Sequence, residues 1–159
     1  MMKKITILAT CVLLTLSACG DSGGAMGANG AAMGGKGDIS QNRSTAFKSF
    51  MPTFSGMGKV VKGDEAYDVE KFKAQAAQFA EEAKVPFEYF QNDPQGNGDA
   101  LPVIWQNAAD FKAEQDKFLA AVDKLNTAAQ SGNLEQIKAA YGDAGASCKS
   151  CHSTYRRPK

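Results

Sequence analysis

Residues with large side chains recur at helical spacing over the first part of the globular region. Six of them between residues 43 and 61 follow one another at spacings of 4, 3, 4, 3 and 4, which places them on one face of a helix. Pro52 lies inside this stretch and has no backbone N–H, so it predicts a kink or an interruption there. The six residues are Arg43, Phe47, Phe50, Phe54, Met57 and Val61.

Three further stretches show the same periodicity, at residues 67–85, 103–130 and 134–155. Asp64 and Glu65 suit the start of the first of these, and Pro86 is expected to end it. No stretch alternates apolar and polar residues as a strand would. The pattern predicts an all-α domain over residues 38–159, folded as an antiparallel four-helix bundle with mostly short connections.

The residues before this domain have the pattern of an export signal. Residues 1–4 are positively charged and residues 5–16 are apolar, a length typical of signal peptides and too short to span a bilayer. Residues 16–19 then resemble a bacterial lipobox, which implies cleavage after residue 18 and lipidation of Cys19. Gly20 follows, which favours the outer membrane over the inner one. An ordinary secretory signal with an incidental Cys19 is the alternative.

Residues 19–37 are rich in glycine and alanine and contain little apolar surface to bury. Such a segment is expected to be a flexible tether that holds the domain away from the membrane. The lipid on Cys19 would then be the chain's only attachment to a membrane, with each buried methylene contributing about 0.8 kcal/mol.

The charge of the chain is close to neutral. Its 18 basic and 17 acidic residues give a net charge of +1, and loss of Lys3 and Lys4 with the signal leaves 16 basic residues against 17 acidic ones, or −1. This balance gives no electrostatic footprint for nucleic acid and no strong steering toward a partner.

The most informative motif lies near the end of the chain, where Cys148, Cys151 and His152 form C-x-x-C-H. This motif is the attachment signature of a c-type haem, in which both thiols form thioethers and the histidine binds the iron. On a helix, the three residues at i, i+3 and i+4 share one face and can meet one haem edge. His152 is the only histidine of the chain, so a second histidine ligand is excluded.

The same motif could belong to a redox dithiol or to a zinc site. The redox interpretation needs a βαβ pattern, which is missing, and the zinc interpretation needs two further ligands. The other cysteines are Cys11 and Cys19, both in the targeting segment. With Cys11 removed, Cys19 lipidated and two thiols on haem, no cysteine remains for a disulfide.

A haem motif on the last helix of a bundle resembles the class II c-type cytochromes, and the cytochromes c′ in particular. The resemblance rests on residues 43–47, 57–63, 104–105 and 142–156, of which the last segment is the longest and most specific. It implies that Arg43 lies near the haem propionates and that Phe47, one turn later, covers the distal face of the iron. It also matches Arg156 to a basic residue beside the proximal histidine, one turn beyond His152.

The resemblance further implies the function. With one haem c held by His152 and Phe47 opposite, we expect a five-coordinate iron that binds nitric oxide and carbon monoxide, with redox activity and a periplasmic redox partner not identified by the sequence. The location is the periplasm, because haem is attached outside the bacterial cytoplasm. The alternative is a six-coordinate electron carrier with Met51 or Met57 as the sixth ligand.

A catalytic haem enzyme such as a peroxidase is not expected, because no acid–base group is predicted at the level of Phe47. Members of this family often form homodimers through their first two helices, so the resemblance implies a homodimer. The Phe72/Phe79 face or the Phe50/Phe54 side could supply that interface.

Overall fold

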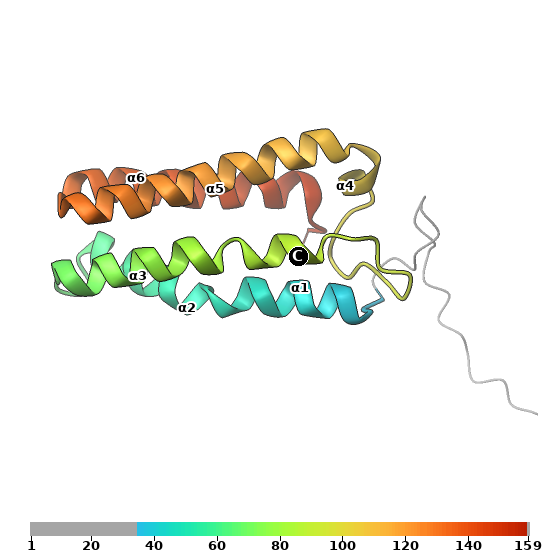
Figure 1. The fold of residues 1–159 in the computed structure, drawn as a ribbon, viewed down its shortest axis with the longest axis horizontal. Helices are drawn as coiled ribbons and strands as arrows, with labels where there is room; N and C mark the ends of the chain where they lie inside the picture. Colours follow the sequence, from blue (N-terminus) through green and yellow to red (C-terminus); the bar gives the residue numbers. More distant parts are fainter. Residues whose placement is uncertain (1–34, 159) are drawn as a thin grey trace, which may run out of the picture.

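The computed structural model describes residues 35–158. They form a bundle whose helices run side by side along its long axis (Figure 1). In chain order the elements are α1 (Asp38–Ser49), α2 (Met51–Lys62), α3 (Val69–Glu82), the 3₁₀ helix η1 (Val85–Tyr89), α4 (Val103–Gln106), α5 (Ala108–Ser131) and α6 (Leu134–Tyr155).

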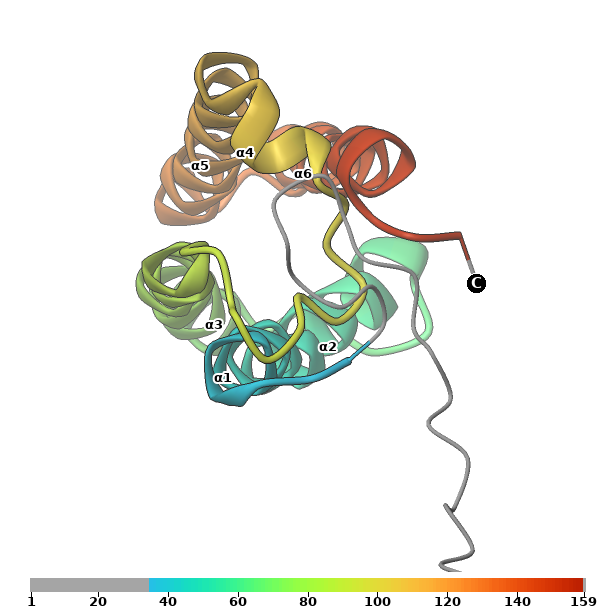
Figure 2. The same ribbon diagram turned by 90° about the vertical axis from the view of Figure 1, so that its right-hand side faces the viewer.

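Four arms make up the bundle: α1 with α2, α3 with η1, α5, and α6. Figure 2 shows them in cross-section, with α5 beside α6 and α3 beside both α2 and α5. Gly63 and Gly132 end α2 and α5 with φ of 84° and 70°, a left-handed conformation that glycine adopts without steric cost. The predicted antiparallel four-helix bundle is confirmed, and within residues 35–158 no strand longer than an isolated bridge occurs.

The first arm is interrupted near the expected place. α1 ends at Ser49, and α2 begins at Met51 with Pro52 in its first turn. Proline is tolerated there, because N–H groups in the first turn have no acceptor within the helix. Phe50 joins the two helices and is 3% exposed. The interruption therefore leaves one continuous apolar face.

Two details of the expected helices differ in the structure. Asp68, and not Asp64 or Glu65, starts the second arm, because its carboxylate accepts the N–H of Lys71 at 3.0 Å and caps α3. The expected helix at 103–130 is divided at Asn107, whose φ of −121° and ψ of 57° separate the short α4 from α5.

The core of the bundle lies between α2, α3, α5 and α6. Its largest members are at most 1% exposed, so they are fully removed from water. They include Met57, Phe72, Phe79, Val122, Leu125 and Ile137. Phe50, Phe72 and Phe79, which the sequence allowed either in the core or in a dimer interface, are buried within one chain and belong to the core.

The signal peptide, Cys19 and the tether up to residue 34 lie outside the described residues. The last three residues expected in the tether, 35–37, contact the loop that follows η1. Gly37 donates its N–H to the Gly96 carbonyl at 3.2 Å, and Gly98 donates to the Gly35 carbonyl at 2.8 Å. In the described part of the chain, no helix is long and apolar enough to cross a membrane.

Candidate haem-binding site

The C-x-x-C-H motif lies on the last two turns of α6. Cys148 and Cys151 are free and half-buried, and His152 is exposed. Cys148 packs against the main core, and Cys151 packs against a second cluster at the end of the bundle, formed by Ile104, Phe111 and Tyr155. Both thiols thus face apolar surroundings, on the side of α6 that the helical spacing predicted.

Burial disfavours the thiolate form of both cysteines. Burial raises the pKa of Cys148 above its ordinary value. Burial, followed by the negative charge of Glu114, raises the pKa of Cys151 to about 11. Over residues 35–158 no group of three or more histidine, cysteine or acidic side chains could hold a metal ion.

A layer of aromatic rings extends from α1 to the end of α6. Phe47 contacts Phe87 and Phe90 of the second arm, with ring centroids 6.0 and 6.1 Å apart. Phe90 contacts Phe111 at 4.7 Å, and Phe111 contacts Tyr155 at 5.2 Å. Since Phe87 and Phe90 also pack against the cluster that holds Cys151, this layer connects Phe47 with the haem motif.

The register between the first arm and α6 fixes which residues lie opposite the motif. The Phe54 ring stacks on Tyr141 at 4.4 Å, and the Tyr141 hydroxyl donates to the Phe54 carbonyl at 3.1 Å. The two arms run in opposite directions (Figure 1). Phe47 lies seven residues before Phe54 and Cys148 seven after Tyr141, so both lie about 10 Å further along the bundle, at one level.

A second contact gives nearly the same register. Gly98 lies against Ser40 of α1, with 3.6 Å between the Ser40 Cβ and the position of an added Gly98 Cβ. The Gly98 carbonyl accepts from the Arg157 guanidinium at 2.7 Å. The start of α1 is therefore level with the end of α6, and Arg43 with Cys151 and His152.

Arg43 is 5% exposed and is held by the end of η1 and by the loop at residues 91–102. Its guanidinium donates to the carbonyls of Tyr89 at 2.8 Å and Asn97 at 2.7 Å, and lies 4.9 Å from the Phe90 ring centre. Burial lowers the pKa of Arg43, and the nearby charge of Asp93 partly opposes this effect.

Asp93 is a buried residue that the sequence analysis missed. It is 2% exposed, and its carboxylate accepts the N–H of Ser40 at 2.8 Å. Because the residue before α1 offers no side-chain cap, Asp93 supplies that cap from 53 residues away. A Cβ on Gly37 would lie 2.1 Å from the carboxylate, so only glycine fits there.

Arg156 does not lie one turn beyond His152 on the helix, as had been expected. α6 ends at Tyr155, and Arg156 has an extended backbone that bridges to Ala100. Its guanidinium lies 3.7 Å from the Asp99 carboxylate. Both predicted pocket arginines therefore contact the same loop, Arg43 from α1 and Arg156 from the end of α6.

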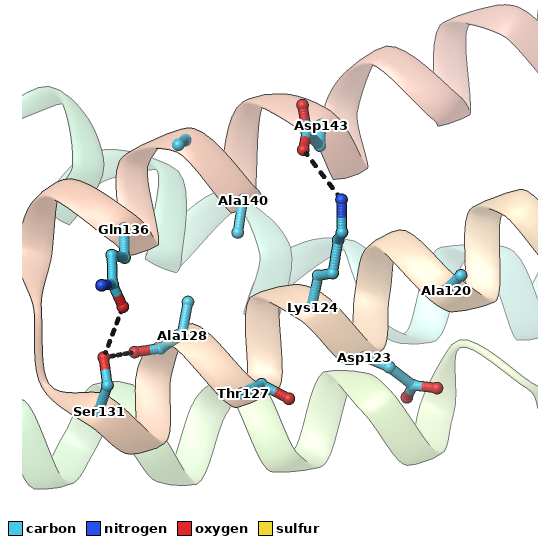
Figure 3. A pocket seen from close by; sticks show the side chains of 10 residues that line it. Ala120, Asp123, Lys124, Thr127, Ala128, Ser131, Gln136, Ala140 and Asp143 are labelled. Carbon is cyan, nitrogen blue, oxygen red and sulfur yellow. Dashed lines mark hydrogen bonds and ion pairs between the residues drawn. The ribbon is translucent and has the colours of Figure 1, made fainter.

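A shallow hollow elsewhere on the surface is unrelated to the motif. It measures about 670 Å³ and lies between α5 and α6, from Ala120 to Asp143 (Figure 3). The ion pair between Lys124 and Asp143, at 3.9 Å, crosses it.

The residues present fit a covalently bound haem. Two unpaired thiols at i and i+3 face an aromatic layer, and a histidine follows directly on the same helix. A helical bundle that carries C-x-x-C-H on its last helix defines a c-type cytochrome of the bundle class.

Comparison with known proteins gives the family. The model of the family described as Cytochrome C' matches residues 38–156. The cytochrome c' of Alcaligenes xylosoxydans is 39% identical over 77% of this chain and 95% of its own, and that of Rubrivivax gelatinosus is 36% identical over 76% and 95%. The chain belongs to the cytochrome c′ family, and its cofactor is one covalent haem c.

A solved structure supports the same assignment. The ferrous form of an arginine-to-lysine variant of cytochrome c prime from Alcaligenes xylosoxidans, with NO bound, matches with a TM-score of 0.73 and 38% identity. The match covers 77% of this chain and 95% of that one.

Proposed function

We propose that this protein binds nitric oxide and carbon monoxide at a five-coordinate haem iron in the periplasm, where the iron also changes oxidation state. In this proposal Cys148 and Cys151 hold the haem through thioethers, and His152 is the iron ligand that the protein supplies. When bound, the haem supplies an iron centre with one open position for a small ligand. Binding of NO by a relative of known structure supports this function.

The observation that carries the proposal is the position of Phe47 along the long axis of the bundle. It lies opposite Cys148 in the register set by Phe54 and Tyr141, and a phenylalanine ring cannot bind iron. The Phe47 ring would cover the distal side of the haem. It would restrict the access of small ligands to the iron without occupying the sixth coordination position.

The two candidate methionine ligands are poorly placed for the alternative. In the same register Met51 is level with Ala144 and Met57 with Lys138, about one turn and nearly three turns from Cys148. Met51 is 46% exposed, and Met57 is fully buried among core residues. Their positions favour an open iron over a six-coordinate electron carrier.

The polar groups near this level favour gases that need no hydrogen-bond donor. Arg43 is the charged residue of α1 at the level of His152, and its guanidinium already donates to the carbonyls of Tyr89 and Asn97. Bound dioxygen acquires negative charge and needs a donor, which nitric oxide and carbon monoxide need less. Peroxide cleavage would need a free acid–base group at the same place, so we propose a binding protein and no peroxidase activity.

Flash photolysis of the ferrous CO complex tests this function. Replacement of Phe47 with alanine should speed the rebinding of carbon monoxide, because it removes the ring that restricts access. Val61→Ala is the matched control, since it removes apolar side-chain atoms from the same arm 14 residues away and should leave the rate unchanged. Equal rates in wild type and Phe47→Ala would contradict the role given to Phe47.

Location and assembly complete the proposal. Export by residues 1–18 and lipidation of Cys19 would anchor the protein to the outer membrane, with residues 19–34 as a tether and a periplasmic protein as redox partner.

We also propose a homodimer through the exposed residues of the first two arms. Sedimentation that shows only monomer at tens of micromolar would contradict the dimer.

A further inference from the structure

Glu114 of α5 points toward the haem motif on α6. Its Oε2 accepts from the Ser150 hydroxyl at 3.2 Å, and Ser150 lies between the two cysteines. Its Oε1 accepts from the Lys117 ammonium at 2.6 Å. The Glu114 side chain is 21% exposed and that of Lys117 is 67% exposed, so the anion is the more buried partner of the pair.

The charge of Glu114 reaches the attachment site. Ser150, whose hydroxyl bonds the Glu114 carboxylate, directly precedes Cys151 on α6, so the charge lies within one residue of an attachment cysteine. The hydrogen bond from Lys117 lowers the pKa of Glu114, so the carboxylate is ionised at neutral pH. Of the other carboxylates on this part of α5, Asp116 pairs with Lys112 and is 57% exposed.

We infer that Glu114 is a positioning residue that holds a fixed negative charge beside the haem edge and lowers the reduction potential of the iron. Reduction adds one electron from an external donor and removes one positive charge from the iron–porphyrin unit. A nearby anion stabilises the charged ferric form more than the ferrous form. The effect depends on burial, because a charge in a less polar environment acts more strongly than one in water.

This role can be separated from a merely structural one. Glu114 also joins α5 to α6 through Ser150, so its loss could change stability alone. Glu114→Gln keeps the length of the side chain and an oxygen that accepts a hydrogen bond, and removes only the charge. The inference depends on covalent haem c and holds whether or not the iron binds nitric oxide.

The test is a redox titration of the holoprotein at pH 7, with thermal unfolding measured in parallel. Glu114→Gln should raise the potential, so that the ferrous-to-ferric ratio at a fixed ambient potential increases about threefold or more. Asp116→Asn, which removes a more exposed carboxylate from the same helix, should change that ratio much less.

A second variant gives a shift of opposite sign. Lys117→Met leaves Glu114 ionised but removes the cation that offsets it, so the potential should fall. This variant also tests the inference if Glu114→Gln does not fold. If Glu114→Gln shifts the potential no more than Asp116→Asn, or if Lys117→Met leaves it unchanged, the inference is wrong, whatever happens to stability.

Discussion

At the closed end of the bundle, where α5 turns into α6, side chains from α2, α3, α5 and α6 pack with almost no exposed area, whereas at the haem end a loop adds buried polar contacts to the aromatic layer. The closed end is held by fully buried residues such as Leu125 and Ile137. The haem end is held by Asp93, Arg43 and Asn97, which are buried and polar. Apolar packing tolerates small changes of geometry, while buried polar groups need their partners in place. The fold is therefore expected to persist when the haem end is altered.

The largest expected effect comes from removing both thiols. The double variant Cys148→Ala with Cys151→Ala should contain no covalent haem, because no other cysteine lies within residues 38–159, and should keep most of its helix content. Mass spectrometry under denaturing conditions and circular dichroism measure the two properties. Cys19→Ala is the matched control and should keep its haem. Covalent haem in the double variant would show that the assigned attachment residues are wrong.

The next largest effect is expected in the closed end. Leu125→Ala should lower the free energy of unfolding by about 2–5 kcal/mol, because it leaves a cavity at a fully buried position. The absorption spectrum of the haem should not change. Chemical denaturation measures the free energy of unfolding, and absorption spectroscopy shows whether the haem environment has changed. A changed spectrum would mean that the two ends are coupled through the core.

At the haem end, we expect a smaller loss of stability together with local opening of the loop. Asp93→Ala removes the acceptor for the N–H groups of Ser40 and Gln95 and should cost about 1–3 kcal/mol. It should also speed proteolysis in residues 91–102, since the loop loses its anchor on α1. Asp93→Asn keeps an oxygen acceptor, so its free energy of unfolding should fall less than that of Asp93→Ala. Unchanged cleavage of the loop in Asp93→Ala would argue against its role as an anchor.

The smallest effect is expected at the start of α6. The Asn133 side chain accepts the N–H groups of Glu135 and Gln136 at 3.0 and 3.1 Å. Asn133→Ala should therefore cost about 1 kcal/mol. Asn126→Ala, a half-buried asparagine within α5 that caps no helix, serves as the control. A loss of more than a few kcal/mol at Asn133 would show that this cap does more than satisfy the helix end.

Much of this arrangement follows from local patterns in the sequence. Helical spacing predicted that Ile137, Ala144, Cys148 and Cys151 share a face, and the structure has each of them buried or half-buried. Pro52 predicted the interruption of the first arm. These features depend on residues within a few turns of one another, which is the range over which periodicity carries information.

The features that were missed depend on contacts between distant residues. Asp93 lies in a loop that looked merely polar, and it caps a helix 53 residues earlier in the chain. Glu114 reaches Ser150 across 36 residues. Arg156 follows the last turn of α6, where the loop draws the chain into an extended conformation, so a count of residues along a helix could not place it. A glycine before α1 without a capping side chain was the one local signal for Asp93.

The central claim is that the iron has no sixth ligand from the protein. The visible absorption spectrum of the ferrous holoprotein, recorded before and after addition of nitric oxide, tests it most directly. The account predicts a high-spin five-coordinate spectrum that changes when nitric oxide is added. A low-spin ferrous spectrum with sharp α and β bands before nitric oxide is added would contradict it, and would make Met51 or Met57 the ligand of an electron carrier.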